Sequence, residues 1–500
     1  SLIIRKSIRE IKMSDYFRKK VHYEDIIATF DDILIQPGYT NFEPNDVDIS
    51  SNLGSYHFNL PIMTAAMDTV TEEIMAIKLA LLGGLGVLHR NCSYERQLEM
   101  VRIVKRARSF IIEDVATIKL DDPITNAKFM MENYNISGLV VVNDENRVCG
   151  ILTKRDMPYS ENDIKNGKVK EYMTKNVISI EPGASREDAL NKLFKYRIEK
   201  LPVIENGHLK GLITKKDLAP EFPLASMDND GHLICALALS PKFPESLQAQ
   251  NMLKEIDKFV DIFFIDVADF YKVADIKGTK KLMNLLESDF VLGNIGTYEA
   301  AEYIISKCDF AEEKFIGLKV GMGSGSICTT SIQTGVGAPT LFATAQVADA
   351  IKDYKPELSL IADGGFKNPG DIPKAFTAGA DLIMSGHFFA GCTESPGYID
   401  TIQEQKVKVY RGMGSKEART SGFISDRYIE GSKILAEGIS AYIPYVGDLD
   451  GVILSLKEGL INGMVYAGAR KIRDMKNVKI GVITPFGRQE VRTHDLIGKY

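Results

Sequence analysis

The chain has 500 residues, with 61 Lys and Arg against 67 Asp and Glu, which gives a formal net charge of −6 at pH 7. A chain of this length exceeds what one hydrophobic core normally organises, so we expect two domains or one elaborated domain. The acidic balance argues against a nucleic-acid-binding protein, which needs a basic surface. Six scattered cysteines without a C-x-x-C pair, and no apolar run of about 18 residues, predict a cytoplasmic protein without a membrane span.

Short apolar runs that end in glycine or a polar residue recur along the chain, separated by segments of helical pattern. The eight runs cover residues 60–67, 83–89, 233–240, 260–266, 290–295, 318–323, 358–364 and 382–386. Buried strands that alternate with helices predict an α/β fold, a (β/α)8 TIM barrel whose active site lies at the C-terminal ends of its strands. A doubly wound open sheet also places its site at strand ends, and periodicity alone leaves that alternative open.

A different pattern appears twice between the second and third runs. The segment GILTKRDM at 150–157 recurs as GLITKKDL at 211–218, and paired repeats of this kind bury a shared face. We therefore expect an inserted domain at about 111–222, with halves 111–171 and 172–222, between barrel segments 1–110 and 223–500.

These repeats resemble a tandem pair of cystathionine β-synthase (CBS) modules, a Bateman pair. In that family a Thr-x-x-Asp at the end of each repeat contacts the ribose of an adenine or guanine nucleotide. The resemblance implies a nucleotide site that includes Thr153, Asp156, Thr214 and Asp217. The same residue types also cap the helices that follow them, so a purely structural role stays open.

Cys328 lies in the glycine-rich segment GMGSGSICTT at 321–330, directly after an apolar run that ends at Val320. A thiol at this point is held on a loop at the end of a strand. The small residues around it leave room for a phosphate or a flat base to approach the backbone. This placement predicts a nucleophile.

Several further motifs accompany the cysteine segment in a fixed order. They are AMDTVTE at 66–72, ADGG at 362–365, AGCTESPG at 390–397, YRGMGS at 410–415 and DRY at 426–428. Together they resemble the inosine 5′-monophosphate (IMP) dehydrogenase/GMP reductase family over nearly everything from Phe30 to the C-terminus. The resemblance implies oxidation of IMP to xanthosine 5′-monophosphate (XMP), with NAD as acceptor, the committing step of guanine nucleotide biosynthesis. GMP reductase, which uses NADPH, and a purine-nucleotide-sensing protein without turnover stay open as alternatives.

The resemblance also implies the roles of single residues. Cys328 attacks C2 of IMP, and after hydride transfer the covalent thioimidate is hydrolysed with the help of Arg427 and Tyr428 from a mobile flap at about 400–445. Thr330 is the hydroxyl neighbour of this chemistry. Asp363, at a strand end, is placed to accept hydrogen bonds from the two ribose hydroxyls. The other expected IMP contacts are Ser326, Gly364, Gly365, Gly386, Tyr410, Met413, Gly414 and Glu437.

Cofactors and partners follow from the same resemblance. Dinucleotide contacts are expected at Asp266, Gly321 and Gly323, although the turn DVADFY at 266–271 lacks the glycine usual in the family. A potassium ion is implied at the backbone of Gly323, Gly325 and Cys328, with Glu490 in the C-terminal segment that a neighbouring subunit contributes. Barrels of the family assemble as homotetramers, which in some members pair into octamers.

Overall fold

The computed structural model describes residues 27–107, 112, 115–133, 136–184, 186–215, 222–420, 423 and 436–491. The chain divides into two compact units. One consists of Ser1–Val104, Leu224–Ser226 and Ile234–Tyr500, and the other of Lys105–Pro223 and Met227–Leu233. Within the described ranges, no helix combines the length and the apolar character that a membrane span requires.

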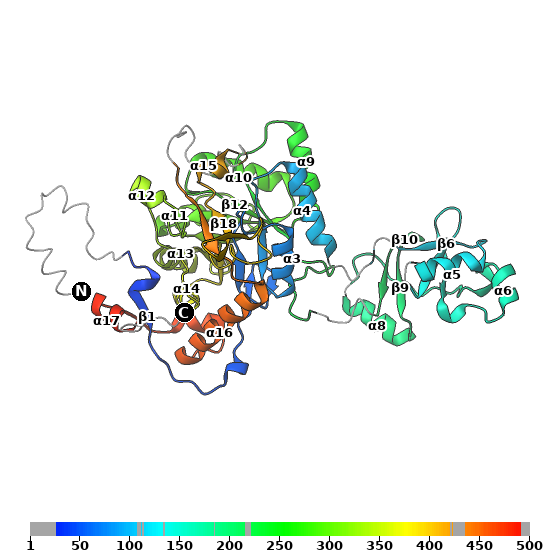
Figure 1. Ribbon diagram of the computed structural model, residues 1–500. Coiled ribbons are helices and arrows are strands. Elements are labelled where there is room, and N and C mark those ends of the chain that lie inside the picture. The colour runs from blue at the N-terminus through cyan, green and yellow to red at the C-terminus, as the bar shows by residue number, and fades with distance from the viewer. Residues whose placement is uncertain are drawn as a thin grey trace, which may run out of the picture. The chain divides into compact units, whose positions relative to one another are not determined.

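Eight parallel strands of the first unit close into a barrel, in the order β11–β12–β13–β14–β15–β16–β4–β5 (Figure 1). In chain order they are β4 (Ile62–Thr64), β5 (Leu85–Leu88), β11 (Ala236–Leu239), β12 (Ile262–Asp266), β13 (Asp289–Ile295), β14 (Phe315–Val320), β15 (Ser359–Asp363) and β16 (Leu382–Ser385). Each overlaps one of the predicted apolar runs, although β14 begins three residues before its run. The expected TIM barrel is therefore confirmed, and the open sheet is excluded.

Alternate residues of the barrel strands share one apolar cluster, which includes Ala236 and Ala238 of β11 and Ile262 and Phe264 of β12. Side chains alternate between the two faces of a strand, so this set fills the barrel interior, while the intervening residues face the helices. The closed sheet thereby holds the C-terminal ends of all eight strands at one rim.

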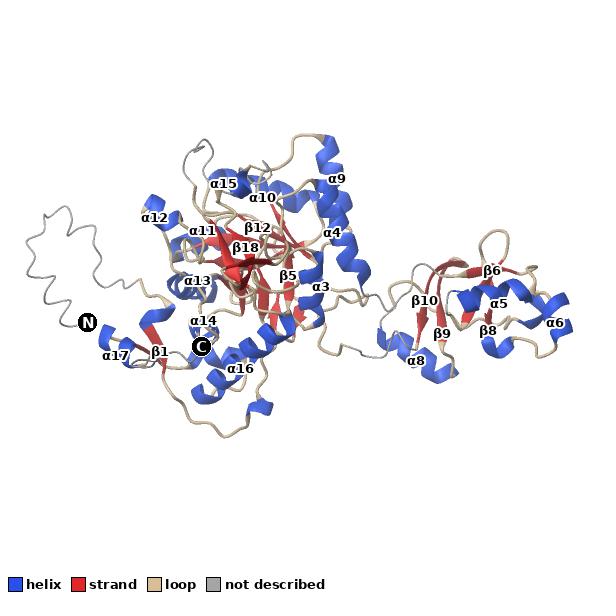
Figure 2. Cartoon of the chain, viewed as in Figure 1, coloured by secondary structure: helices blue, strands red, loops and turns tan. Residues whose placement is uncertain are grey.

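Helices surround the strands of this unit (Figure 2). They are α3 (Glu73–Leu81), α4 (Tyr94–Ala107), α9 (Leu247–Asp257), α10 (Val273–Leu285), α11 (Tyr298–Ser306), α13 (Thr340–Tyr354), α14 (Asp371–Thr377) and α16 (Leu449–Ala467). Local capping fixes where some of them begin. Ser246 accepts a hydrogen bond from the backbone N–H of Ala249 at the start of α9, and Thr297 accepts one from Ala300 at the start of α11.

Shorter elements complete the unit. A three-stranded antiparallel sheet consists of β17 (Asp400–Ile402), β18 (Gln405–Arg411) and β19 (Ser440–Pro444), with β18 in the middle. The pairs β1 (Ile33–Ile35) with β20 (Ile480–Val482) and β2 (Ser51–Leu53) with β3 (Tyr56–Phe58) are also antiparallel. The short helices are α12 (Thr330–Thr334), α15 (Lys416–Arg419) and α17 (Pro485–Glu490).

The second unit carries the repeated pattern. Its first half contains β6 (Thr117–Lys119), α5 (Ile124–Asn133), β7 (Gly138–Val142), β8 (Val148–Thr153), α6 (Glu161–Asn166) and α7 (Val169–Tyr172). Its second half contains α8 (Arg186–Tyr196), β9 (Lys200–Glu205) and β10 (His208–Thr214). Strand β8 and strand β10 are the two copies of the repeated segment, and each pairs antiparallel with the strand before it. The apolar strands of both halves are buried, as a shared face predicts.

Candidate active site

A cavity of about 270 Å³ opens at the C-terminal ends of the barrel strands. From the segment after β14 it is lined by Gly321, Gly323, Gly325, Ser326, Cys328 and Thr330. Other strand ends contribute Asp266, Asp363, Gly364, Gly365 and Gly386. Tyr410, Met413 and Glu437 come from the region of the three-stranded sheet. The structure therefore brings together, in one cavity, most of the residues that the sequence singled out.

Cys328 lies between the end of β14 and the short helix α12. Its backbone N–H donates to the carbonyl of Gly325, which closes the turn that presents the thiol. The sulfur lies 3.3 Å from the hydroxyl oxygen of Thr330 and 3.8 Å from the carbonyl oxygen of Glu437. Thr330 is buried beneath it. The arrangement holds a half-buried thiol against a hydroxyl at the wall of the cavity.

Asp363 ends strand β15 and faces two donors from neighbouring strands. Lys319 donates to Oδ2 of Asp363, and the side-chain amide of Asn294 donates to the same oxygen over 3.1 Å. Among the described residues, every hydrogen bond to this carboxylate falls on Oδ2. Oδ1 is therefore the oxygen that can accept from a ligand hydroxyl, as the expected ribose contact requires.

Lys319 is a site residue that the sequence analysis missed. Its side chain is fully buried in β14 and donates to Asp266 over 3.1 Å, to Asp363 and to the amide oxygen of Asn294. The ammonium group thus joins the predicted ribose contact to the predicted dinucleotide contact. The available signal was a lysine inside an otherwise apolar strand, because a buried charge needs partners.

Tyr410 and Gly386 meet in the same cavity. The ring of Tyr410 is buried, its hydroxyl forms a hydrogen bond with Ser326, and burial raises its pKa to about 12. A Cβ atom on Gly386 would lie 2.8 Å from that hydroxyl oxygen, so only glycine allows this close approach. The tyrosine is a neutral donor at physiological pH, suited to an oxygen of a phosphate group.

The segment 436–439, which lines the cavity with Glu437, is tied to the cysteine loop by backbone hydrogen bonds. Thr329 N–H donates to the carbonyl of Glu437 over 3.1 Å, and Ile439 N–H donates to Ile327 over 3.0 Å. Glu437 N–H donates in turn to the carbonyl of Gly414 over 3.1 Å. Glu437 lines the cavity as expected. Gly414 itself does not line it, and its carbonyl is engaged in holding Glu437.

The remaining predicted residues are not among the described residues that line the cavity. Arg427, Tyr428 and Asp217 fall outside the described residues. Glu490 ends α17, away from the cavity. In the second unit, the backbone N–H and the hydroxyl of Thr153 both donate to Oδ2 of Asp156, over 2.8 and 2.7 Å, which is the capping arrangement weighed above as an alternative to nucleotide binding. Thr214 ends β10.

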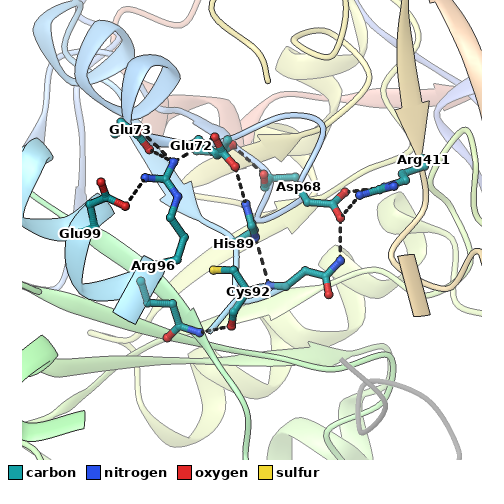
Figure 3. Close-up of polar contacts among 12 residues, drawn as sticks. Asp68, Glu72, Glu73, His89, Cys92, Arg96, Glu99 and Arg411 are labelled. Atoms are coloured by element: carbon teal, nitrogen blue, oxygen red, sulfur yellow. Dashed lines mark hydrogen bonds and ion pairs between the residues drawn. The ribbon is translucent and has the colours of Figure 1, made fainter. Parts of the chain in front are cut away.

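A polar network beside the cavity was also not foreseen (Figure 3). Arg411, at the end of β18, forms two hydrogen bonds with the carboxylate of Asp68. Asn91 donates to Asp68 over 2.7 Å, and its backbone N–H donates to Nδ1 of His89 over 3.0 Å. His89 thereby has its other nitrogen directed at Glu72, 3.2 Å away. The network connects the loop after β4, the end of β5 and the strand that carries Tyr410.

Known proteins resemble this chain over most of its length. Residues 27–494 match the family model described as "IMP dehydrogenase / GMP reductase domain". The chain belongs to the IMP dehydrogenase/GMP reductase family. The inosine-5′-monophosphate dehydrogenase of Korarchaeum cryptofilum is 42% identical over 472 residues, which cover 94% of this chain and 96% of that protein. The enzyme of the same name from Methanocaldococcus jannaschii is 40% identical over 498 residues, which cover 96% of this chain and 97% of that protein.

Family members also appear among similar solved structures. A cysteine-to-alanine variant of GMP reductase from Trypanosoma brucei, in complex with guanosine 5′-monophosphate, has a TM-score of 0.74 and 31% identity, with 94% of this chain and 98% of that chain covered. The family assignment thus extends over both units of the chain. The higher identities belong to proteins named as dehydrogenases.

Proposed function

We propose that this chain catalyses the NAD-dependent oxidation of IMP to XMP, the committing step of guanine nucleotide synthesis. The observation that carries the proposal is the Cys328–Thr330 pair, 3.3 Å apart, at the wall of a cavity that also contains Asp363 and Tyr410. Cys328 can act as the nucleophile, Asp363 can accept hydrogen bonds from the ribose, and Tyr410 can donate one to the phosphate of the same nucleotide. The dehydrogenase relatives at about 40% identity support this reaction over others of the family.

In the proposed first step, the thiolate of Cys328 adds to C2 of IMP. The new carbon–sulfur bond makes C2 tetrahedral, and a hydride leaves C2 for the oxidised nicotinamide, which is reduced. Asp363 orients the ribose and Tyr410 the phosphate, so that C2 stays near the sulfur. The carbonyl oxygen of Glu437, 3.8 Å from the sulfur, accepts a weak hydrogen bond from the thiol and so orients it before the proton is lost.

The second step is hydrolysis of the cysteine-bound thioimidate. A water molecule adds to C2, the carbon–sulfur bond breaks, and XMP leaves while the thiol is restored. The hydroxyl of Thr330 lies beside the sulfur and is placed to pass a proton during this step. We propose that Arg427 and Tyr428, from the flap, activate the water, as the family resemblance implies.

The residues at hand fit the expected cofactors. Asp266, Gly321 and Gly323 line the same cavity, where a dinucleotide could contact them, and NAD would supply the hydride acceptor. Potassium prefers oxygen ligands such as backbone carbonyls. Gly323, Gly325 and Cys328 offer three within one turn, and Gly323 has a left-handed φ of 78° that only glycine adopts readily. We propose this turn as the cation site, with Glu490 of a neighbouring subunit in a homotetramer.

GMP reductase is the second candidate, and the similarity to the trypanosomal enzyme favours it. In that reaction the same cysteine would displace ammonia from GMP, and NADPH would return a hydride to C2. A reductase needs no hydrolytic step, so the Arg427–Tyr428 motif distinguishes the two. The two assignments therefore differ in which nucleotide forms the adduct and in the direction of hydride flow.

One experiment separates these candidates. The protein is incubated with IMP and NAD, and the mass of the peptide with Cys328 is measured together with NADH formation. We expect a nucleotide adduct on Cys328 and NADH release, both lost in Cys328→Ala and both kept in Cys308→Ala, which alters another half-buried cysteine. Arg427→Ala should still release NADH once per site but accumulate the adduct. NADPH oxidation with GMP, and no NADH from IMP, would show a reductase. Nucleotide binding without either reaction would show a sensor.

A further inference from the structure

Lys408 is a lysine inside strand β18, with 1% of its surface exposed. An ammonium group has three N–H donors, and this one has three acceptors. They are the carbonyl oxygens of Cys392 at 2.9 Å, Thr393 at 3.4 Å and Ser395 at 2.5 Å. Burial lowers the pKa of Lys408, and the nearby Glu394 opposes this shift. A buried charge is costly unless acceptors such as these carbonyls satisfy it.

The three carbonyls lie at one end of a hydrogen-bonded loop, residues 386–395. The loop begins at Gly386, whose carbonyl accepts from Ala390 N–H over 2.9 Å. The hydroxyl of Ser395 lies 2.8 Å from the carbonyl oxygens of both Ala390 and Cys392. These bonds link the two ends of the loop, so the contacts of Lys408 near Ser395 also restrain Gly386.

The other end of the same loop meets Tyr410. Lys408 and Tyr410 are both buried, and Val409 between them is exposed, so the two side chains face the same side of β18. The hydroxyl of Tyr410 lies next to Gly386 and bonds to Ser326. The strand is therefore fixed to the loop at two points, at Lys408 and at Tyr410.

We infer that Lys408 is a positioning residue for the phosphate end of the substrate site. It fixes β18 against the 386–395 loop, so that the Tyr410 hydroxyl, the Gly386 backbone and Ser326 keep the spacing that a phosphate needs. The inference rests on the proposed function, in which these three residues hold the phosphate of IMP. Lys408 acts through them and does not touch the substrate.

The test compares a nucleotide with its nucleoside. Dissociation constants of IMP and of inosine, which lacks the phosphate, are measured by calorimetry for the full chain and for Lys408→Met, which keeps the length of the side chain and removes the charge. We expect IMP to bind about 10-fold or more weakly, since charge-assisted hydrogen bonds to the phosphate are misaligned. Inosine should bind unchanged. Lys406→Met, an exposed lysine two residues earlier on the same strand, should change neither constant.

Ser395→Ala provides a second variant, because Lys408→Met takes one donor away from each of three carbonyls and can prevent folding. It loosens the same loop and keeps the lysine, so we expect a smaller loss of affinity for IMP, again without effect on inosine. A folded variant with unchanged IMP affinity, or with an equal loss for both ligands, would overturn the inference. If the unaltered chain does not bind IMP, the proposed function fails first and the inference falls with it.

Discussion

Arg411 and Asp68, 343 residues apart in the chain, form a bidentate ion pair, with Nε to Oδ1 at 3.0 Å and Nη2 to Oδ2 at 2.7 Å. The Asp68 side chain is nearly buried and that of Arg411 is about one-third exposed. Paired hydrogen bonds of this geometry are stronger than single ones. The pair therefore anchors the end of β18, which follows Tyr410, to the barrel loop after β4.

Replacing Asp68 tests this anchor. Asp68→Asn removes the charge and presents an amide donor to a guanidinium that has only donors, so we expect the free energy of unfolding to fall by about 2 kcal/mol. Urea denaturation measures it. Asp450→Asn breaks the exposed Lys78–Asp450 pair instead and should cost about 0–1 kcal/mol. Equal losses in the two variants would mean that the Arg411–Asp68 pair is no stronger than a surface pair.

Lys319→Met removes the cation between two carboxylates. Asp266 and Asp363 would then lose the cation that lies between them in a buried site, and we expect a loss of about 3–5 kcal/mol in the free energy of unfolding, together with loss of NADH formation. Lys258→Met, at an exposed pair with Glu255, is the matched control and should lose less than about 1 kcal/mol. A stable Lys319→Met protein would contradict the structural role assigned to this ammonium group.

Gly386→Ala tests the close approach at the phosphate end. The added methyl group would lie 2.8 Å from the hydroxyl oxygen of Tyr410 and 2.9 Å from the sulfur of Met67, so one of them must move. We expect KM for IMP to rise about 10-fold or more, with a smaller change in kcat. Steady-state kinetics measures both. Gly451→Ala, in helix α16 with open space around the glycine, should leave both unchanged.

The second unit should become less stable as the pH rises above neutrality. His232 lies 3.7 Å from Asp228, and this contact raises its pKa above 6.5. A raised pKa means that the histidine stabilises the folded unit below about pH 6.5 and that this contribution is lost as the pH rises through the folded value. Hydrogen exchange at pH 6 and pH 8 measures the difference. His232→Gln should remove it, and a difference that survives this substitution would rule the histidine out.

The same site should respond to acid in the opposite direction. Burial opposes ionisation of Asp228, but His232 and Lys105 outweigh it and lower the pKa of this carboxyl to about 2. A lowered pKa contributes stability that is present above about pH 4 and lost as the pH falls through 2. Protonation of Asp228 therefore ends the stabilising contribution of this contact at low pH, and deprotonation of His232 ends it at high pH.

The barrel was predictable from sequence because buried parallel strands read as continuous apolar runs, and each of the eight runs overlaps a strand. The positions of Cys328 and Asp363 followed from the same reasoning, since residues at strand ends share one rim. Lys319 and the Asp68–Arg411 pair were not predictable in this way. Contacts between distant segments depend on strand order and side-chain direction, which local periodicity does not contain.

Other expectations depended on resemblance. Gly414 matches the family motif, but its carbonyl holds Glu437, and this could not be read from the motif alone. Thr153 and Asp156 match the nucleotide motif of the CBS repeat and bond to each other as in an end cap, while nucleotide binding there stays a prediction. A motif gives residue types and spacing, whereas the partner of each polar group is decided by the fold.

The barrel hydrogen-bonds directly across the insertion, with β5 paired to β11 through Val87 and Ala236. At the insertion itself, Lys105 and Asp228 lie only 2.6 Å apart, so the chain departs and returns at nearly the same point. A short linker in place of the residues between Lys105 and Asp228 would leave all the strand pairs of the barrel intact. The pairing of β5 with β11 therefore does not depend on the residues between them, and the barrel sheet is closed by strands of the first unit alone.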